Sequence, residues 1–143
     1  MHIHHELDEL HALTNDHFNN RRTEDYLHCF SEEPQLLISG YPFIYTQEGL
    51  QDLVHRRIRD GHKKISHALR YAQQDDDLAY AIGEWRIRLE TSGEERHYQW
   101  MAVYERSGEG SWKIKSLFAV ESPDATGLSC PDLFNFYQVF RSN

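Results

Sequence analysis

The chain has 143 residues and a formal net charge of −8. This length allows one domain with a buried core, and the acidic balance argues against nucleic acid, whose phosphates would be repelled. No apolar run is long enough to span a bilayer, and the first residues lack a secretory pattern. We therefore expect a cytoplasmic protein that forms a single domain over residues 1–143, with a core over roughly 5–121 and an extension over 122–143.

The first half of the chain has the periodicity of helices. Apolar residues recur at helical spacing from Glu6, and Thr23 and Thr46 stand where N-cap residues are expected. The pattern predicts helices over about 6–20, 23–33 and 46–61, with a short strand over 35–39 between the last two.

Four antiparallel strands are expected after the third helix. Residues 63–73 alternate with a period of two, and 78–121 reads as three strands joined by polar turns at 91–94 and 107–111. Asp75, Asp76 and Asp77 stand between the first two strands. They could bind a cation, but a hairpin turn explains them without one, because no further ligand spacing supports a metal.

Pairing across these turns predicts Trp85 opposite Trp100 and Gly83 opposite Ala102. Because side chains alternate between the faces of a sheet, one face becomes rich in aromatic residues. The inner face is predicted to hold Ala81, Gly83, Trp85, Ile87, Tyr98, Trp100, Ala102, Tyr104, Trp112, Ile114, Ser116, Phe118 and Val120. The other face mixes charged residues with the apolar residues Ile82, Met101, Val103 and Leu117.

Residues 77–85 (DLAYAIGEW) and 110–115 (GSWKIK) resemble strands of the nuclear transport factor 2-like superfamily, in particular its SnoaL-like, ketosteroid-isomerase-like branch. The resemblance covers roughly residues 5–121. It implies an α+β fold in which a cone-shaped, mixed and mainly antiparallel sheet wraps around three N-terminal helices, as in a cystatin-like barrel. It also implies a pocket in the mouth of the cone and a homodimer, which would cover Ile82, Met101, Val103 and Leu117.

The resemblance does not settle the activity, because this fold supports many. Ketosteroid isomerases use an inward aspartate as a base, together with a tyrosine and a neutral aspartate. The predicted strands of this chain carry no inward aspartate, and Glu84 falls on the outer face. This departure weakens the isomerase interpretation.

His67 is the candidate general base or acid, because it is predicted on the inner face and imidazole titrates near neutral pH. Alternatively, it is a core histidine with satisfied hydrogen bonds. Trp85 and Trp100 either form a wall for a planar ligand or fill the core. The candidate ligand-binding residues are Tyr26, Phe30, Tyr41, Tyr45, Trp85, Tyr98, Trp100 and Phe118; Tyr71 is a further candidate phenolic donor.

No metal or cofactor is expected. The histidines of the first five residues could ligate a metal, but a solvated chain end is the preferred explanation, because a terminal site lacks the further groups that orient metal ligands. Cys29 and Cys130 lie far apart without CxxC spacing, which fits a reducing compartment, and whether they pair stays open.

Two functions follow from these observations. The first is a small-molecule pocket for a hydrophobic or aromatic ligand, with proton transfer at His67 as an added possibility. The second is a non-catalytic association domain. In that case an aromatic C-terminal helix, with Leu133, Phe136, Tyr137 and Phe140 on one side, docks on a partner.

Overall fold

A computed structural model describes residues 2–122 of the chain, so the predicted C-terminal helix lies outside the described residues. The elements are helices α1 (His2–Asn19) and α2 (Thr23–Leu27), strand β1 (Phe30–Ile38), helix α3 (Gln47–Arg59), and strands β2 (His62–Asp75), β3 (Leu78–Leu89), β4 (Glu95–Arg106) and β5 (Trp112–Ser122). The five strands form one sheet in the order β1-β5-β4-β3-β2.

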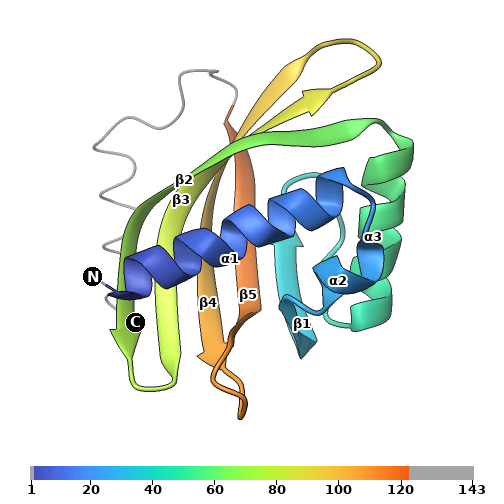
Figure 1. Cartoon of the computed structure of the whole chain (residues 1–143). Helices are drawn as coiled ribbons and strands as arrows, with labels where there is room; N and C mark the ends of the chain where they lie inside the picture. The colour runs from blue at the N-terminus through green and yellow to red at the C-terminus, as the bar shows by residue number, and fades with distance from the viewer. Residues whose placement is uncertain (1, 123–143) are drawn as a thin grey trace.

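The helices lie on the concave face of a curved sheet. Figure 1 shows α1 crossing this face while α2 and α3 lie beside the β1 edge. Strand β1 runs parallel to β5, and the other neighbours are antiparallel. Helix α3 also contacts β2, so it touches both edge strands of the sheet. The α+β architecture expected from the sequence is confirmed, and the side chains between helices and sheet form the core.

Each helix forms where the sequence predicts one. Helix α1 buries Ile3, Leu7, His11 and Phe18 at helical spacing. Helix α3 begins after Thr46, whose hydroxyl accepts a hydrogen bond from the Gly49 amide at 2.9 Å. The predicted cap of α2 is wrong: Arg22 occupies that position, and its side chain makes no capping bond.

The second helix is shorter than predicted, and β1 is longer. Phe30 and Pro34 both belong to β1, and the register of β1 against β5 shifts between Phe30 and Gln35. Proline lacks an amide hydrogen, so it is tolerated in edge strands and at irregularities. Pro34 therefore did not mark the boundary that the sequence suggested.

The face assignment is correct on β3 and β4 but needs correction elsewhere. Trp85 pairs with Tyr98 and Gly83 pairs with Trp100, a shift of two residues that keeps every side chain on its predicted face. A bulge between Val103 and Tyr104 then reverses the rest of β5.

Four of the residues assigned above lie on the face opposite the predicted one because of that bulge: Ser116, Leu117, Phe118 and Val120. Leu117 pairs with Ala102 and lies in the core with 2% of its surface exposed, so it cannot form part of an outer surface. Phe118 pairs with Met101 on the convex face, so its predicted place beside Trp100 is wrong.

Strand β2 has two further irregularities. Between Lys64 and Ser66 the extra residue is Ile65, and a second register shift lies between Leu69 and Tyr71. As a result Tyr71 pairs with Ile82 on the convex face, whereas an unbroken period-two alternation from His67 would place it inside.

Candidate functional site: the concave face of the sheet

Three buried aromatic residues, which we call the aromatic wall, line the concave face: Trp85, Tyr98 and Trp100. The Trp85 ring centroid lies 5.8 Å from that of Trp100 and 6.4 Å from that of Tyr98. All three side chains are at most 4% exposed. Within the described part of the chain, no acceptor reaches the indole nitrogens of Trp85 and Trp100. Buried polar atoms of this kind usually have a hydrogen-bond partner. The two indole N–H groups of the wall are therefore available to donate to a bound molecule.

Two buried cations, which we call the cation pair, lie beside this wall: Arg57 of α3 and Lys64 of β2. They are 4% and 6% exposed. Lys64 reaches the interior because the bulge at Ile65 places it opposite Ile87, while His67, three residues later, lies opposite Trp85. The period-two alternation of residues 63–73 puts Lys64 on the face opposite that of His67, and Arg57 has no sequence signal beyond its place in an amphipathic helix.

The Lys64 ammonium group lies inside a set of aromatic rings. Its nitrogen is 4.8 Å from the Trp85 centroid, 5.2 Å from that of Phe18 and 5.3 Å from that of Tyr26. Burial, with the nearby Arg57 charge, lowers the pKa of Lys64 to about 7. Burial likewise raises the pKa of Tyr26 to about 12. Aromatic faces attract the cation, but they do not replace the water that it loses on burial.

Arg57 is held between two tyrosine rings. Its guanidinium carbon lies 4.9 Å from the Tyr41 centroid and 5.7 Å from that of Tyr98. Its atoms Nε and Nη2 are buried without a hydrogen-bond partner among the described residues. Burial is also the main reason that the pKa of Tyr98 is raised. The interior thus holds a second buried cation, two of whose donor atoms have no acceptor in residues 2–122.

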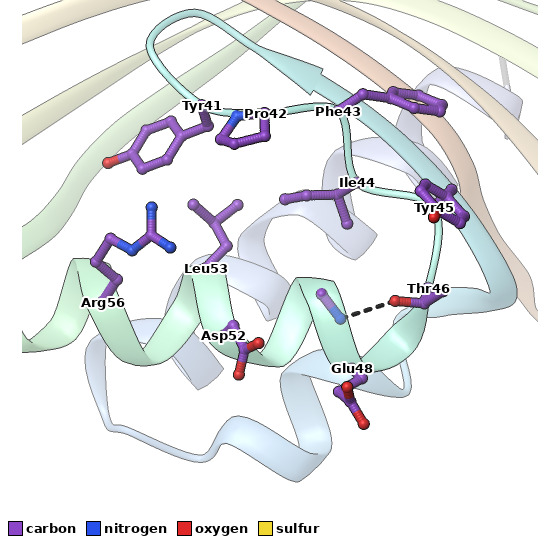
Figure 2. Close-up of a pocket in the computed structure, with 11 residues that line it drawn as sticks. Tyr41, Pro42, Phe43, Ile44, Tyr45, Thr46, Glu48, Asp52, Leu53 and Arg56 are labelled. Carbon is purple, nitrogen blue, oxygen red and sulfur yellow. Dashed lines mark hydrogen bonds between the residues drawn. The ribbon is translucent and has the colours of Figure 1, made fainter.

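A groove of about 410 Å³ borders Tyr41 on the other side, and we call it the Tyr41 groove. Figure 2 shows the chain from Tyr41 to Thr46 facing α3, with Tyr41 beside Arg56 and Ile44 near Leu53. Tyr45 also lines the groove and is 65% exposed. Tyr41 lines the groove and its ring also contacts Arg57, so it lies between this opening and the cation pair.

His67 lies inside, as predicted, and both of its ring nitrogens have protein partners. Nε2 lies 3.0 Å from Asp8 Oδ1, and Nδ1 lies 3.2 Å from Asn15 Nδ2. An ionised carboxylate only accepts and an amide NH₂ only donates, so Nε2 carries the proton and the Nδ1 lone pair is occupied. In this arrangement His67 cannot take a proton from a ligand unless one of these bonds opens.

A second histidine that the sequence analysis missed lies deeper. His11 is 1% exposed, stacks on Trp100 at 4.4 Å, and has Nε2 2.5 Å from the Tyr104 hydroxyl. Burial lowers the pKa of His11 to about 3, with smaller contributions from the His67 and Lys64 charges. His11 is therefore neutral near pH 7, and its helical spacing with Leu7 and Phe18 was the available signal for its inward position.

The other predicted ligand residues are not gathered in one place. Tyr26 and Phe30 are buried neighbours with ring centroids 5.2 Å apart, and Tyr26 contacts Lys64. Tyr41 and Tyr45 meet at the Tyr41 groove, and Phe118 lies on the opposite face. Glu84 lies on the convex face, as expected, where it pairs with His97 at 2.8 Å and accepts from Arg70 at 2.6 Å.

The remaining features singled out in the sequence are the aspartates at 75–77, the N-terminal histidines and Cys29. Asp76 occupies the β2–β3 turn with φ of 56°, and His2, His4 and His5 belong to α1. Within residues 2–122 no cluster of three or more His, Cys, Asp or Glu side chains could hold a metal ion. Cys29 is a free thiol, and burial raises its pKa to about 11. None of the helices in the described part of the chain is long and apolar enough to cross a membrane.

Comparison with solved structures identifies the fold. The chain is similar to a ketosteroid isomerase-like protein from Erwinia carotovora atroseptica, with a TM-score of 0.71 and 14% identity over 82% of this chain and 95% of that one. It is also similar to an NTF2-like protein with a cystatin-like fold from Novosphingobium aromaticivorans, with a TM-score of 0.69 and 16% identity over 87% and 86%. A third similar structure is a protein of unknown function with a cystatin-like fold from Nostoc punctiforme. Its TM-score is 0.72, with 15% identity over 83% of this chain and 90% of that one.

These similarities show that the chain has the cystatin-like α+β fold of NTF2-like proteins. No protein-family model and no curated protein matches the sequence. At this level of identity the comparisons define the fold, and the function has to be argued from the side chains.

Proposed function

We propose that the protein binds a small aromatic or hydrophobic molecule on its concave face, against the aromatic wall. The observation that carries this proposal is the unsatisfied indole donors of Trp85 and Trp100, which stand on a buried apolar surface. Ligand sites commonly combine aromatic walls with a few polar groups that fix orientation. The Tyr41 groove lies nearby, because Tyr41 of its lining contacts Arg57, which in turn contacts Tyr98 of the wall.

The proposal concerns binding, because the two nitrogens of His67 already have partners in Asp8 and Asn15. Proton transfer at His67 stays a prediction from the sequence. The association-domain alternative rested on the C-terminal residues, which lie outside the described part of the chain. No observation in residues 2–122 favours it over ligand binding.

The indole N–H signals of the three tryptophans test the proposal directly. In ¹⁵N-labelled protein titrated with the uncharged compound 2-naphthamide, we expect saturable shifts of the Trp85 and Trp100 indole signals. The Trp112 signal should not move, because Trp112 lies at the start of β5 with Arg106 over its own ring. Replacing Trp85 by leucine should remove the saturation. Binding that shifts only Trp112, or no shift at all, would contradict the proposal.

We also propose that a second copy of the chain covers the convex face. Apolar residues of β1, β4 and β5 adjoin there: Leu37, Met101, Val103, Phe118 and Val120. Leu37 and Val120 are 50% and 47% exposed. This surface replaces the predicted one, since Leu117 faces the core and Ile82 has only 1% of its surface exposed. Apolar patches of this kind commonly mark interfaces.

Replacing Phe118 by glutamate should convert a dimer to a monomer, because the new charge would be buried at the interface. The mass in solution, measured by light scattering during size-exclusion chromatography, checks this. Leu13→Glu is the matched control, since Leu13 is 47% exposed on α1, away from the convex face. A monomeric wild-type protein, or a Phe118→Glu variant that stays dimeric, would rule out this interface.

A further inference from the structure

The cation pair has no acidic partner among residues 2–122. The groups that face Lys64 are Phe18 and His11 of α1, Tyr26 of α2, Cys29, Arg57 of α3, His62 of β2 and Trp85 of β3. No carboxylate is among them, and no ion pair of the described residues involves Arg57 or Lys64.

Two like charges buried together are costly. Removing a charge from water is unfavourable unless an opposite charge or hydrogen bonds replace the lost solvent. Arg57 and Lys64 also repel each other, since the Arg57 charge lowers the pKa of Lys64. Asp and Glu outnumber Lys and Arg by 23 to 15 in the chain, yet Arg57 and Lys64 are buried together with no acidic partner among residues 2–122. An anion from outside the chain would offset this cost.

The unsatisfied atoms of Arg57 indicate which anion fits. Nε and Nη2 stand on the same edge of the guanidinium group, and their hydrogens point in parallel. This edge matches the two oxygens of a carboxylate, which it can bind with two parallel hydrogen bonds. A planar apolar body attached to that carboxylate would meet the rings of Trp85 and Tyr98.

We propose that the ligand is a small aromatic carboxylate, whose carboxylate group binds Arg57 and Lys64 while its ring packs on the aromatic wall. This inference rests on the proposed function, because it names the chemical class of the ligand at the same site. It adds that charge recognition, rather than apolar contact alone, selects the ligand.

A matched pair of ligands separates the inference from the proposed function. The compounds 2-naphthoate and 2-naphthamide have nearly the same shape, and only the first carries a charge. In calorimetric titrations of the full chain near pH 6, we expect naphthoate to bind at least about tenfold more tightly, since one charge-assisted pair contributes about 1.4 kcal/mol or more.

Variants assign that preference to the cation pair. Arg57→Met and Lys64→Met should each reduce naphthoate affinity about tenfold or more while leaving naphthamide affinity within about threefold. Unchanged naphthamide binding also shows that the variants fold. Arg59→Met and Lys63→Met are the matched controls. Each substitution removes one positive charge from α3 or β2, but at an exposed residue. Both controls should keep the wild-type preference.

The dependence on pH gives an independent readout. Naphthoate stays ionised from pH 6 to pH 9, whereas Lys64, with its pKa of about 7, loses its proton in this range. The affinity of naphthoate for the wild-type protein should therefore fall as pH rises. Its affinity for the Lys64→Met variant should not change over the same pH range.

Three outcomes would overturn the inference. Equal affinities of naphthoate and naphthamide would be consistent with the proposed function but would rule out recognition of a carboxylate by the cation pair. A loss of preference in Arg59→Met as large as that in Arg57→Met would assign the effect to surface charge. Failure of both compounds to bind would overturn the proposed function together with the inference.

Discussion

Replacing Gly83 by alanine should lower the free energy of unfolding by about 3 kcal/mol, the upper part of the usual range for overpacking a core. A Cβ atom at this position would lie 2.4 Å from Trp100 Cζ2 and 2.5 Å from the Ala68 carbonyl oxygen. The second of these atoms belongs to the backbone of β2, so it cannot move without disturbing the pairing of β2 with β3. Urea unfolding followed by tryptophan fluorescence measures the effect.

Gly108→Ala is the matched control for this prediction. An added Cβ atom at Gly108 meets nothing within 4 Å, and this glycine does not have a positive φ angle. The control should change stability by no more than about 0.5 kcal/mol. If Gly83→Ala were as stable as the control, Trp100 would not be packed flat against β3, and the aromatic wall would have a different shape.

The stability of the wild-type protein should rise with pH between about pH 7 and pH 9 because of Lys64. Its pKa falls from the ordinary value of 10.5 to about 7 in the folded chain. Between these values the unfolded chain binds one more proton at this position than the folded chain does. The free energy of unfolding therefore increases with pH, with a contribution that approaches about 1.4 kcal/mol per pH unit.

Comparison with Lys64→Met isolates this contribution. The variant should be more stable than the wild type at pH 6, because an apolar side chain of similar length replaces a buried charge, and it should lack the rise above pH 7. Lys63→Met should keep the rise, since Lys63 is exposed. Measurements should stop near pH 9, because the raised pKa values of Cys29 and Tyr26 make stability fall at higher pH. Identical pH slopes in wild type and Lys64→Met would contradict a buried cation.

Much of the fold could be predicted because its strands are long and its turns have clear signals. The hairpin at Asp76 and the cap at Thr46 were read correctly, as were the faces of β3 and β4. The order of elements, together with the resemblance of residues 77–85 and 110–115, led to the fold that the solved structures confirm.

The candidate site was harder to predict, because bulges decide which side chains of β2 and β5 point inward. One extra residue moves every later side chain of a strand to the opposite face of the sheet. No residue type at these positions of the sequence indicates such a bulge. Because of the extra residue Ile65, Lys64 points into the core. Because of the register shift between Val103 and Tyr104, Leu117 faces the core and Phe118 lies on the convex face. Arg57 was missed for a different reason: a charged residue on an amphipathic helix is normally expected to face water.

The pairing of β1 with β5 has a consequence for how the protein reaches its folded state. Leu36 and Leu117 are partners although most of the chain lies between them, and Ile114 donates to the Cys29 carbonyl oxygen at 2.9 Å. Contacts of such long range are slow to form, because the intervening chain must be ordered first. Helices α1 and α2 can pack on β2 and α3 before β5 exists, but β1 lacks its partner in the sheet until β5 has been synthesised. The interval before β5 is made is the period in which this protein is most exposed to aggregation.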